Sequence, residues 1–307
     1  LTDISMDHRY ISICGMTEEE LLTNFKEGIS ELAEANGDTE EATIAKLKAR
    51  YDGYHFEENT VGLYNPFSVL NTLSRLRYKD YWFETGTPTF LVDLLKMHNY
   101  RLPDMTKERV SDDVINSVDS LSTNPIPVIY QSGYLTIKGY DERFKKYLLG
   151  FPNKEVEEGF LNFLLPLYCS AGDRSAFMVD EFVKDVETGH VEQFMNRLTA
   201  FFTDNNYQVA GEAELYFQNA MYLVFKIMGF YTQVERPTSD GRIDAIIQTP
   251  NYIYVIECKL DRTADEAIKQ IENNGYAEPF LMDKRKLYKI GVSFSSETRG
   301  VAEYKIK

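Results

Sequence analysis

The chain of 307 residues is 43% hydrophobic and 13% aromatic, which is typical of a folded globular protein with about two domains. No apolar run approaches the roughly 18 residues of a membrane span, and no signal peptide opens the chain, so we expect no association with membranes. The cysteines, Cys14, Cys169 and Cys258, are too few and too widely spaced for a disulfide framework or a zinc site. They predict a reducing, cytoplasmic environment.

The net charge of −15 argues at first against nucleic acid as a partner. The charge is unevenly distributed, because residues 211–307 hold 13 Lys and Arg against 14 Asp and Glu, whereas residues 1–210 hold 20 against 34. The acidic front part favours a protein partner or self-association. The near-neutral last third carries a basic cluster at residues 284–289, which is either a solvated face or a phosphate-binding face.

The first hundred residues are predicted to form helices joined by aromatic-rich turns. Thr17 and Glu20 make a capping box that opens an amphipathic helix. Further helices are expected over residues 40–49, 69–76 and 90–95. The turns at 51–56 and 64–68 are rich in aromatic residues, and we interpret these side chains mainly as packing groups whose Tyr hydroxyls reach the backbone.

The pattern changes after residue 100. Residues 128–137 predict the end of a helix or a strand, then a Gly turn and a strand, and residues 147–152 predict a second strand after a charged loop. Two strands with a charged tip beside helices indicate a winged-helix-like hairpin, although the mixed charges of the tip favour packing or protein contact over DNA. Three helices are expected between residues 155 and 202, and the best domain boundary lies at residues 203–206.

The last third predicts the order α–β–β–β–α–β. It begins with a helix over residues 213–228 and a strand at 231–235. An antiparallel hairpin follows, with strands at 243–248 and 252–258 around a Thr-Pro-Asn turn. A capping box of Thr263 and Glu266 opens another helix, which runs to about residue 274, and a core strand at 287–294 ends the series. Glu214 stands at the head of the apolar stripe of the first helix, with Glu212 as the rival position.

The hairpin carries a set of residues suited to binding a metal ion. If the loop centres on residues 250 and 251, Asp244 and Glu257 face each other across the ladder. Side chains alternate along a strand, so Glu257 and Lys259 share one face while Cys258 points to the other. Glu257 ends an apolar run that predicts a buried central strand, where an acid needs a partner or a metal. Carboxylates bind hard divalent cations, and a neighbouring lysine orients water or balances charge on a phosphate.

At these residues the chain resembles the PD-(D/E)xK nuclease superfamily, through the acid in GRIDAII and the motif E-x-K in YVIECKL. The resemblance implies that Asp244 and Glu257 bind Mg²⁺ or Mn²⁺ with help from the Cys258 carbonyl, and that Lys259 is the catalytic lysine. It also implies a metal-binding Glu214, and a supporting Gln270 from the stretch AIKQI…Y, against the alternative of a surface glutamine. Ile243 stands where the family's name has a proline.

The front of the chain is similar to the later part of an AAA-ATPase-like module that precedes this nuclease-like domain in bacterial proteins. LTDIS, GMTEEEL, YDGYHF, LYNPFSVL and YWFETGTP carry this resemblance. No P-loop motif occurs in the 307 residues, so we expect no ATP hydrolysis by them. The expected domains are residues 1–98 (helical, AAA-like), 99–205 (winged-helix-like and helical) and 206–307 (restriction-endonuclease-like, with a mixed central sheet).

Two functions follow from the sequence. The first is a Mg²⁺-dependent nuclease that acts on DNA or RNA through residues 206–307. The alternative is a non-catalytic module of the same fold, used for binding and regulated by an ATPase. The intact pattern of Asp244, Glu257 and Lys259 favours the first.

Overall fold

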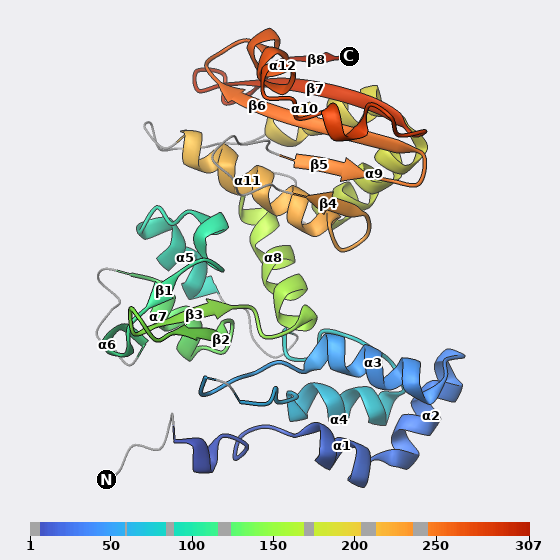
Figure 1. Cartoon of the computed structure of the whole chain (residues 1–307), viewed down its shortest axis with the longest axis vertical. Helices are drawn as coiled ribbons and strands as arrows, with labels where there is room; N and C mark the ends of the chain where they lie inside the picture. Colours follow the sequence, from blue (N-terminus) through green and yellow to red (C-terminus); the bar gives the residue numbers. More distant parts are fainter. Residues whose placement is uncertain are drawn as a thin grey trace. The chain divides into compact units, whose positions relative to one another are not determined.

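The computed structural model describes residues 7–58, 60–83, 89–115, 124–168, 175–203, 213–235 and 245–307 (Figure 1). The chain divides into two compact units, residues 1–160 and 161–307. No helix among the described residues has both the length and the apolar character needed to cross a membrane. The fold is a mixed α and β architecture in which helices surround two separate sheets.

Four helices open the first unit. They are α1 (Glu18–Asn24), α2 (Lys26–Asn36), α3 (Glu40–Tyr51) and α4 (Pro66–Arg75). The capping box predicted at Thr17 is present, because its hydroxyl accepts from the Glu20 N–H and the Glu20 carboxylate accepts from the Thr17 N–H. The apolar faces of the four helices meet in a core that includes Leu21, Leu32 and Leu47. Tyr51 and Tyr64 of the aromatic turns pack in this core as expected, whereas Phe67 is exposed, and the Tyr51 hydroxyl donates to the Lys79 carbonyl at 2.9 Å.

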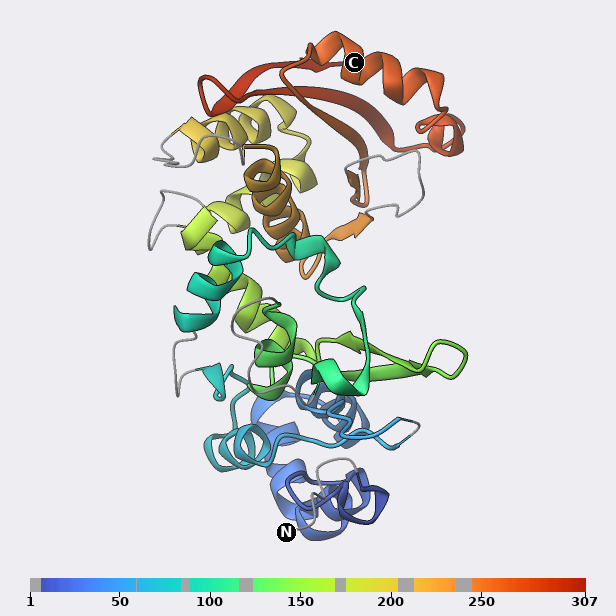
Figure 2. The ribbon, with the colours of Figure 1, turned by 90° about the vertical axis from the view of Figure 1, so that its left-hand side faces the viewer.

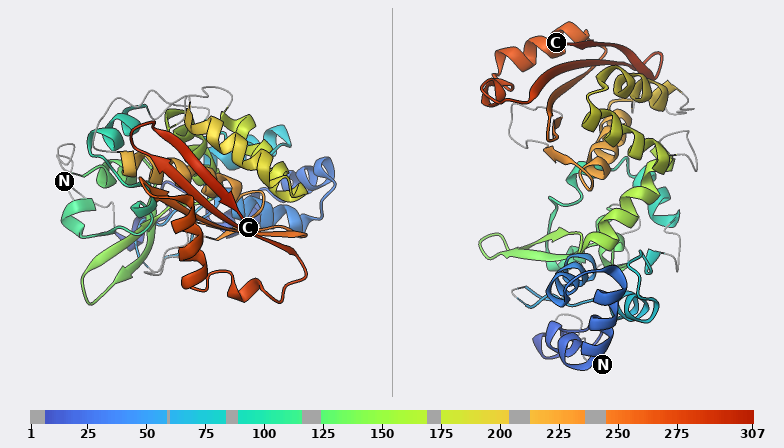
Figure 3. Two further views of the ribbon diagram at one scale, coloured as in Figure 1. Left: turned by 90° about the horizontal axis from the view of Figure 1, so that it is seen from above. Right: turned by 90° about the vertical axis from the view of Figure 1, so that its right-hand side faces the viewer.

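The rest of the first unit surrounds a small antiparallel sheet with the order β1-β3-β2. Its elements are α5 (Thr89–Met97), β1 (Arg109–Val110), α6 (Asp112–Ile115), α7 (Ile126–Gln131), β2 (Thr136–Asp141) and β3 (Lys146–Gly150), with short 3-10 helices at His8–Tyr10 and Leu102–Asp104. The predicted hairpin is confirmed as β2 and β3, which project from the helices of this unit (Figures 2 and 3). At its tip Arg109 and Asp141 form an ion pair at 2.9 Å.

The second unit contains a five-stranded sheet with the order β4-β5-β6-β7-β8. Its strands are β4 (Gln233–Glu235), β5 (Ala245–Gln248), β6 (Tyr252–Leu260), β7 (Lys286–Ser295) and β8 (Gly300–Ile306). Its helices are α9 (Ser175–Thr188), α10 (Val191–Thr203), α11 (Ala213–Met228) and α12 (Ala264–Asn273), with a 3-10 helix at Glu278–Phe280, and α8 (Lys154–Tyr168) crosses between the units. Strands β6 and β7 are parallel and the other pairs are antiparallel, so the sheet is mixed, as predicted.

Helices cover both faces of this sheet. Figure 2 shows α12, in orange-red, on one side of the long strands and the yellow helices α9 and α10 on the other. On the α12 side, Ile253 and Val255 of β6 pack against Ile268 and Ile271. On the other side, Phe217 of α11 stacks on Phe294 of β7 with ring centroids 4.6 Å apart. Central strand β6 is therefore buried from both sides, which agrees with its continuous apolar run.

The predicted order α–β–β–β–α–β is confirmed by α11, β4, β5, β6, α12 and β7. Edge strand β8 is an addition that the sequence pattern did not predict. Strand β4 begins at residue 233 rather than 231, because residues 229–231 form a turn after α11. Helices α9 and α10 belong to the second unit, which thus begins before residue 206.

Candidate functional site

Strand β6 holds the candidate site residues, and the turn before it fixes their position. The antiparallel register pairs Ala245 with Ile256 and Gln248 with Ile253. Arg285 stabilises this turn by donating to the Gln248 side-chain oxygen at 3.0 Å and to the Thr249 carbonyl at 3.3 Å. This arginine of the basic cluster is thus engaged within the protein and links the end of β5 to the segment that precedes β7.

Glu257 and Lys259 lie together on the α12 side of the sheet. Glu257 is only 2% exposed, and its Oε1 accepts from the Lys259 Nζ at 2.7 Å. The lysine side chain is 18% exposed, so the pair spans the step from the buried interior to the surface. Cys258 pairs with Val292 and points to the opposite face, as the alternation of a strand requires.

The neighbouring strand β7 makes room for α12 beside this pair. In the parallel register Glu257 pairs with Gly291, and Lys259 pairs with Ser293. A Cβ on Gly291 would collide with the backbone oxygen of Ala264, the first residue of α12. The buried Ser293 hydroxyl donates to the Arg262 carbonyl just before the helix. Gly291 and Ser293 together bring the first turn of α12 close to the carboxylate.

The start of α12 is held by further polar contacts. Thr263 and Glu266 form the predicted capping box. Glu303 of β8 accepts from the Ala264 N–H at 2.7 Å, and this satisfies one of the N–H groups that a helix start leaves without an intrahelical partner. Lys305 pairs with Asp265 in the same turn. The first turn of α12 is therefore held in place both by contacts within the helix and by the edge strand β8.

Sequence reasoning identified neither Gly291, Ser293 nor Glu303. A glycine and a serine within an otherwise apolar strand are a weak signal. Glu303 belongs to the strand that was not predicted, so its role depends on a tertiary contact that local patterns do not show.

The supporting residues Gln270 and Tyr276 lie on and just after α12, and both are partly buried. Tyr276 packs against the apolar cluster below α12, and its hydroxyl accepts from the Asn274 side chain at 2.6 Å. A role for Gln270 near the reacting groups remains a prediction.

Of the remaining predicted side-chain ligands, Glu214 is the one that lies among the described residues. Glu214 lies in the first turn of α11, where its carboxylate is exposed and accepts from the Gln218 amide at 3.0 Å. The apolar stripe that Glu214 heads is buried as expected, with Phe217 at 5% and Met221 at 4% exposure. Asp244 and the rival Glu212 lie outside the described residues.

The described residues offer oxygen donors but no complete metal site. Among them no group of three or more His, Cys, Asp and Glu side chains is arranged to hold a metal ion. The donors present are the Glu257 carboxylate and the Cys258 carbonyl, and these are hard oxygen ligands of the kind that Mg²⁺ and Mn²⁺ take. The donor chemistry fits a magnesium ion, with Asp244 needed as a second carboxylate.

Three comparisons place this site among known proteins. Residues 212–304 match the family model described as PD-(D/E)XK nuclease superfamily. The chain is 30% identical over 322 residues to the "Uncharacterized protein in vnfD 5'region" of Azotobacter chroococcum mcd 1, an alignment that covers all of this chain and 59% of that protein. No solved structure matches the chain. The matched region begins just before α11 and contains strands β4 to β7, most of β8 and the Glu257 and Lys259 pair, so this part of the chain is similar to the PD-(D/E)XK nuclease superfamily.

Proposed function

We propose that residues 206–307 form a metal-dependent phosphodiesterase that cleaves nucleic acid. The observation that carries this proposal is the Glu257 carboxylate, buried at the end of the central strand and 2.7 Å from the Lys259 ammonium. A structural core gains little from a buried charge, because removing the carboxylate from water is unfavourable. A site that binds metal and phosphate needs a carboxylate for the metal and an ammonium for the phosphate, and the pair holds both groups in fixed positions.

The proposed roles follow the chemistry of each residue. Glu257, Asp244 and the Cys258 carbonyl hold Mg²⁺ or Mn²⁺, with Glu214 as a further candidate ligand. The register of β5 and β6, continued by one pair beyond Ala245 and Ile256, would bring Asp244 opposite Glu257. When bound, the metal lowers the pKa of a water molecule and balances charge on the phosphate.

Lys259 is the residue proposed to act on the nucleophile. Its ammonium reaches the surface at 18% exposure while the neighbouring carboxylate fixes its direction. From there it orients a water molecule or stabilises negative charge that develops on a phosphate oxygen. Gln270 on the adjacent α12 supports the lysine or the phosphate.

Metal binding is the first test. Isothermal titration of Mg²⁺ and of Mn²⁺ into the full chain is compared with the double variant Asp244→Asn/Glu257→Gln. We expect binding by the wild type and its loss in the variant. No binding by the folded wild type up to millimolar metal would refute the metal site.

One observation favours the non-catalytic alternative. Glu257 already has a lysine partner, so the pair can be read as a structural ion pair in a binding module. Lys259→Met leaves a buried carboxylate without this partner, and we expect a loss of about 3–5 kcal/mol in unfolding free energy under either function. Stability of this variant alone therefore does not separate the two functions.

The double variant Glu257→Gln/Lys259→Met separates them. It removes both charges at nearly constant shape, so stability should return close to that of the wild type. A catalytic site predicts Mg²⁺-dependent cleavage of DNA or RNA by the wild type and none by the folded double variant. A binding module predicts no cleavage by either. Lys305→Met is the matched control, because its partner Asp265 is 60% exposed and such pairs contribute only about 0–1 kcal/mol.

The whole-protein setting is part of the same proposal. The chain spans about 59% of the length of the relative it matches, and we infer that residues 1–98 are the end of an AAA-ATPase-like module, followed by the winged-helix-like region 99–205, in a bacterial cytoplasmic protein. That part would contact a protein partner or a second copy of the chain. Limited proteolysis of the longer protein, with and without ATP, tests whether an ATPase module and this region communicate.

A further inference from the structure

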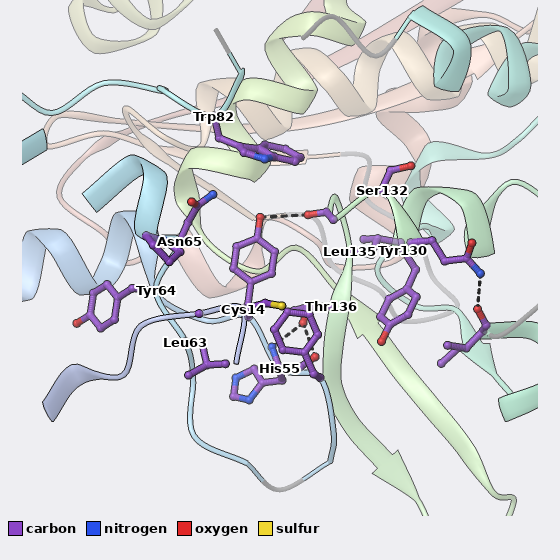
Figure 4. A pocket seen from close by; sticks show the side chains of 17 residues that line it. Cys14, His55, Leu63, Tyr64, Asn65, Trp82, Tyr130, Ser132, Leu135 and Thr136 are labelled. Carbon is purple, nitrogen blue, oxygen red and sulfur yellow. Dashed lines mark hydrogen bonds between the residues drawn. The ribbon is translucent and has the colours of Figure 1, made fainter. Parts of the chain in front are cut away.

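A cavity of about 640 Å³ lies in the first unit, and none of its lining residues has a role in the proposed phosphodiester cleavage (Figure 4). It is bounded by residues 54–56 and 63–66, by the end of α7 and by the beginning of β2. Binding sites for small molecules usually have volumes of about 300–1,000 Å³. The cavity is therefore large enough for a ligand with one or two rings.

Aromatic side chains form much of its wall, contributed by Tyr54, Phe56, Trp82 and Tyr130. The Trp82 ring is held firmly, because it meets Tyr134 edge to face with centroids 4.9 Å apart. Its backbone N–H also donates to the buried Glu155 carboxylate at 3.0 Å. Planar ligands stack well on such fixed rings, which lose little conformational freedom on binding.

The described lining contains no Lys, Arg, Asp or Glu side chain. Burial and the nearby Lys138 lower the pKa of the lining residue His55, which keeps its ring neutral near pH 7. Residues 1–160 hold 27 Asp and Glu against 17 Lys and Arg, a formal charge of −10. A phosphate or carboxylate would find no cation in the cavity and a repulsive surrounding charge, so an anionic group inside the cavity is disfavoured.

Some polar groups of the cavity are occupied by internal hydrogen bonds. The Tyr54 hydroxyl donates to the Gly133 carbonyl at 3.2 Å, and the Thr136 hydroxyl donates to the His55 carbonyl at 2.8 Å. Other groups retain hydrogen-bonding capacity. The Gln131 side-chain amide donates to the Ile115 carbonyl at 2.9 Å, and its side-chain oxygen can accept a hydrogen bond from a ligand.

The neutral polar rim completes this set. Figure 4 shows Ser132 at the top of the cavity beside the end of α7, where its hydroxyl can donate and accept. The His55 Nδ1 lies 3.0 Å from the Thr60 carbonyl, so Nδ1 carries the proton and Nε2 is an acceptor. The cavity thus combines flat apolar walls with donors and acceptors for the edge of a ring.

We propose that this cavity binds a nucleobase, a neutral planar heterocycle with hydrogen-bonding groups along its edge. The base reaches the cavity either as a free nucleoside or as an unpaired base of a nucleic acid strand. The proposal is independent of the metal site, because none of the lining residues belongs to the second unit.

The single tryptophan of the chain provides the measurement, since Trp82 lines the cavity. The full chain, in EDTA, is titrated with adenosine, guanosine, cytidine and uridine while its fluorescence is corrected for absorption by the nucleoside. Isothermal titration gives an independent affinity. We expect saturable binding of at least one nucleoside.

Matched variants of Cys14 localise the binding. Cys14 lines the cavity and is also exposed, so Cys14→Phe adds a ring to the cavity without disturbing the core, while Cys14→Ser changes only the sulfur. We expect Cys14→Phe to weaken nucleoside binding at least about tenfold and Cys14→Ser to retain it. Tighter binding of a short single-stranded oligonucleotide than of the nucleoside would identify a base within a strand as the ligand, and the reverse order a free nucleoside.

Three results would overturn the proposal. They are the absence of saturable binding by all four nucleosides, equal affinity in Cys14→Phe and wild type, and equal affinity for indole, which has the size of a base but lacks most of its edge groups. Circular dichroism of each variant establishes that the protein tested is folded.

Discussion

Glu155, at the start of α8, makes the stability of the first unit dependent on pH. Its side chain is 0% exposed, and Oε1 accepts from the Ser68 hydroxyl at 2.9 Å and from the Trp82 N–H at 3.0 Å. Burial raises the pKa of this carboxyl from 4.5 to about 7, and nearby Asp80 adds to the rise. The two hydrogen bonds and the Arg50 guanidinium oppose it without cancelling it.

The sign of the effect follows from proton binding. Between pH of about 4.5 and 7 the folded state holds a proton on Glu155 that the unfolded state has released. The folded state binds more protons, so the free energy of unfolding falls as pH rises through this window and levels off above it. At about 1.36 kcal/mol for each pKa unit, the full change is about 3 kcal/mol.

Glu155→Gln tests this reasoning, because the amide keeps the oxygen that accepts from Ser68 and Trp82 but carries no charge at any pH. We expect the variant to be more stable than the wild type at pH 8 by about 1–3 kcal/mol, the lower value allowing for an amide N–H without an acceptor. Below pH 4.5 the difference should vanish or reverse.

Urea denaturation between pH 4 and 8, followed by Trp82 fluorescence, reports unfolding of the unit that contains Glu155. The control is Glu27→Gln, an exposed carboxylate on α2, which should leave the pH dependence unchanged. If wild type and Glu155→Gln have parallel profiles, the raised pKa is refuted. Arg50 also pairs with Asp80 and Glu158, and these groups are the same in wild type and Glu155→Gln, so the difference between the two profiles belongs to residue 155.

Substitutions at three further positions test the contacts that hold the candidate nuclease site in place. Gly291→Ala should destabilise the second unit by about 1–3 kcal/mol in thermal or urea unfolding, because the added methyl group collides with the Ala264 oxygen. Glu303→Ala should lower the unfolding free energy by about 1 kcal/mol through loss of the cap on α12, and Glu303→Gln should recover most of it. Arg285→Lys should destabilise by about 1–2 kcal/mol, since a lysine cannot bridge the Gln248 side chain and the neighbouring carbonyl, and unchanged stability would remove its role in the β5–β6 turn.

Local sequence patterns predicted those elements of the second unit whose structure is determined by residues close together in the chain. The apolar run of β6 identified a central strand, because strands buried on both faces lose the alternation of polar and apolar residues. The Thr263 capping box identified the start of α12, since its bonds lie within four residues. The Thr-Pro-Asn turn between β5 and β6 identified the hairpin.

Other features depend on contacts that no local pattern contains. Strand β8 lies at the edge of the sheet and carries Glu303 and Lys305, so it lacks the apolar signal of the inner strands. The apolar stripes of α9 and α10 indicate burial but do not identify the surface that covers them. For the same reason, the cavity around Trp82 could not be anticipated, because it joins residues 54–66 to α7 and β2.

The position of Glu257 makes its contribution to the stability of the second unit difficult to separate from its proposed role in metal binding. The apolar half of β6 is buried between helices, and the burial ends within the short step from Glu257, at 2% exposure, to Lys259, at 18%. The pair therefore lies where the buried interior meets the surface, and charges placed there interact more strongly than in bulk water, which suits metal binding. Charge-neutral isosteres, rather than alanine, are the substitutions that distinguish its two roles.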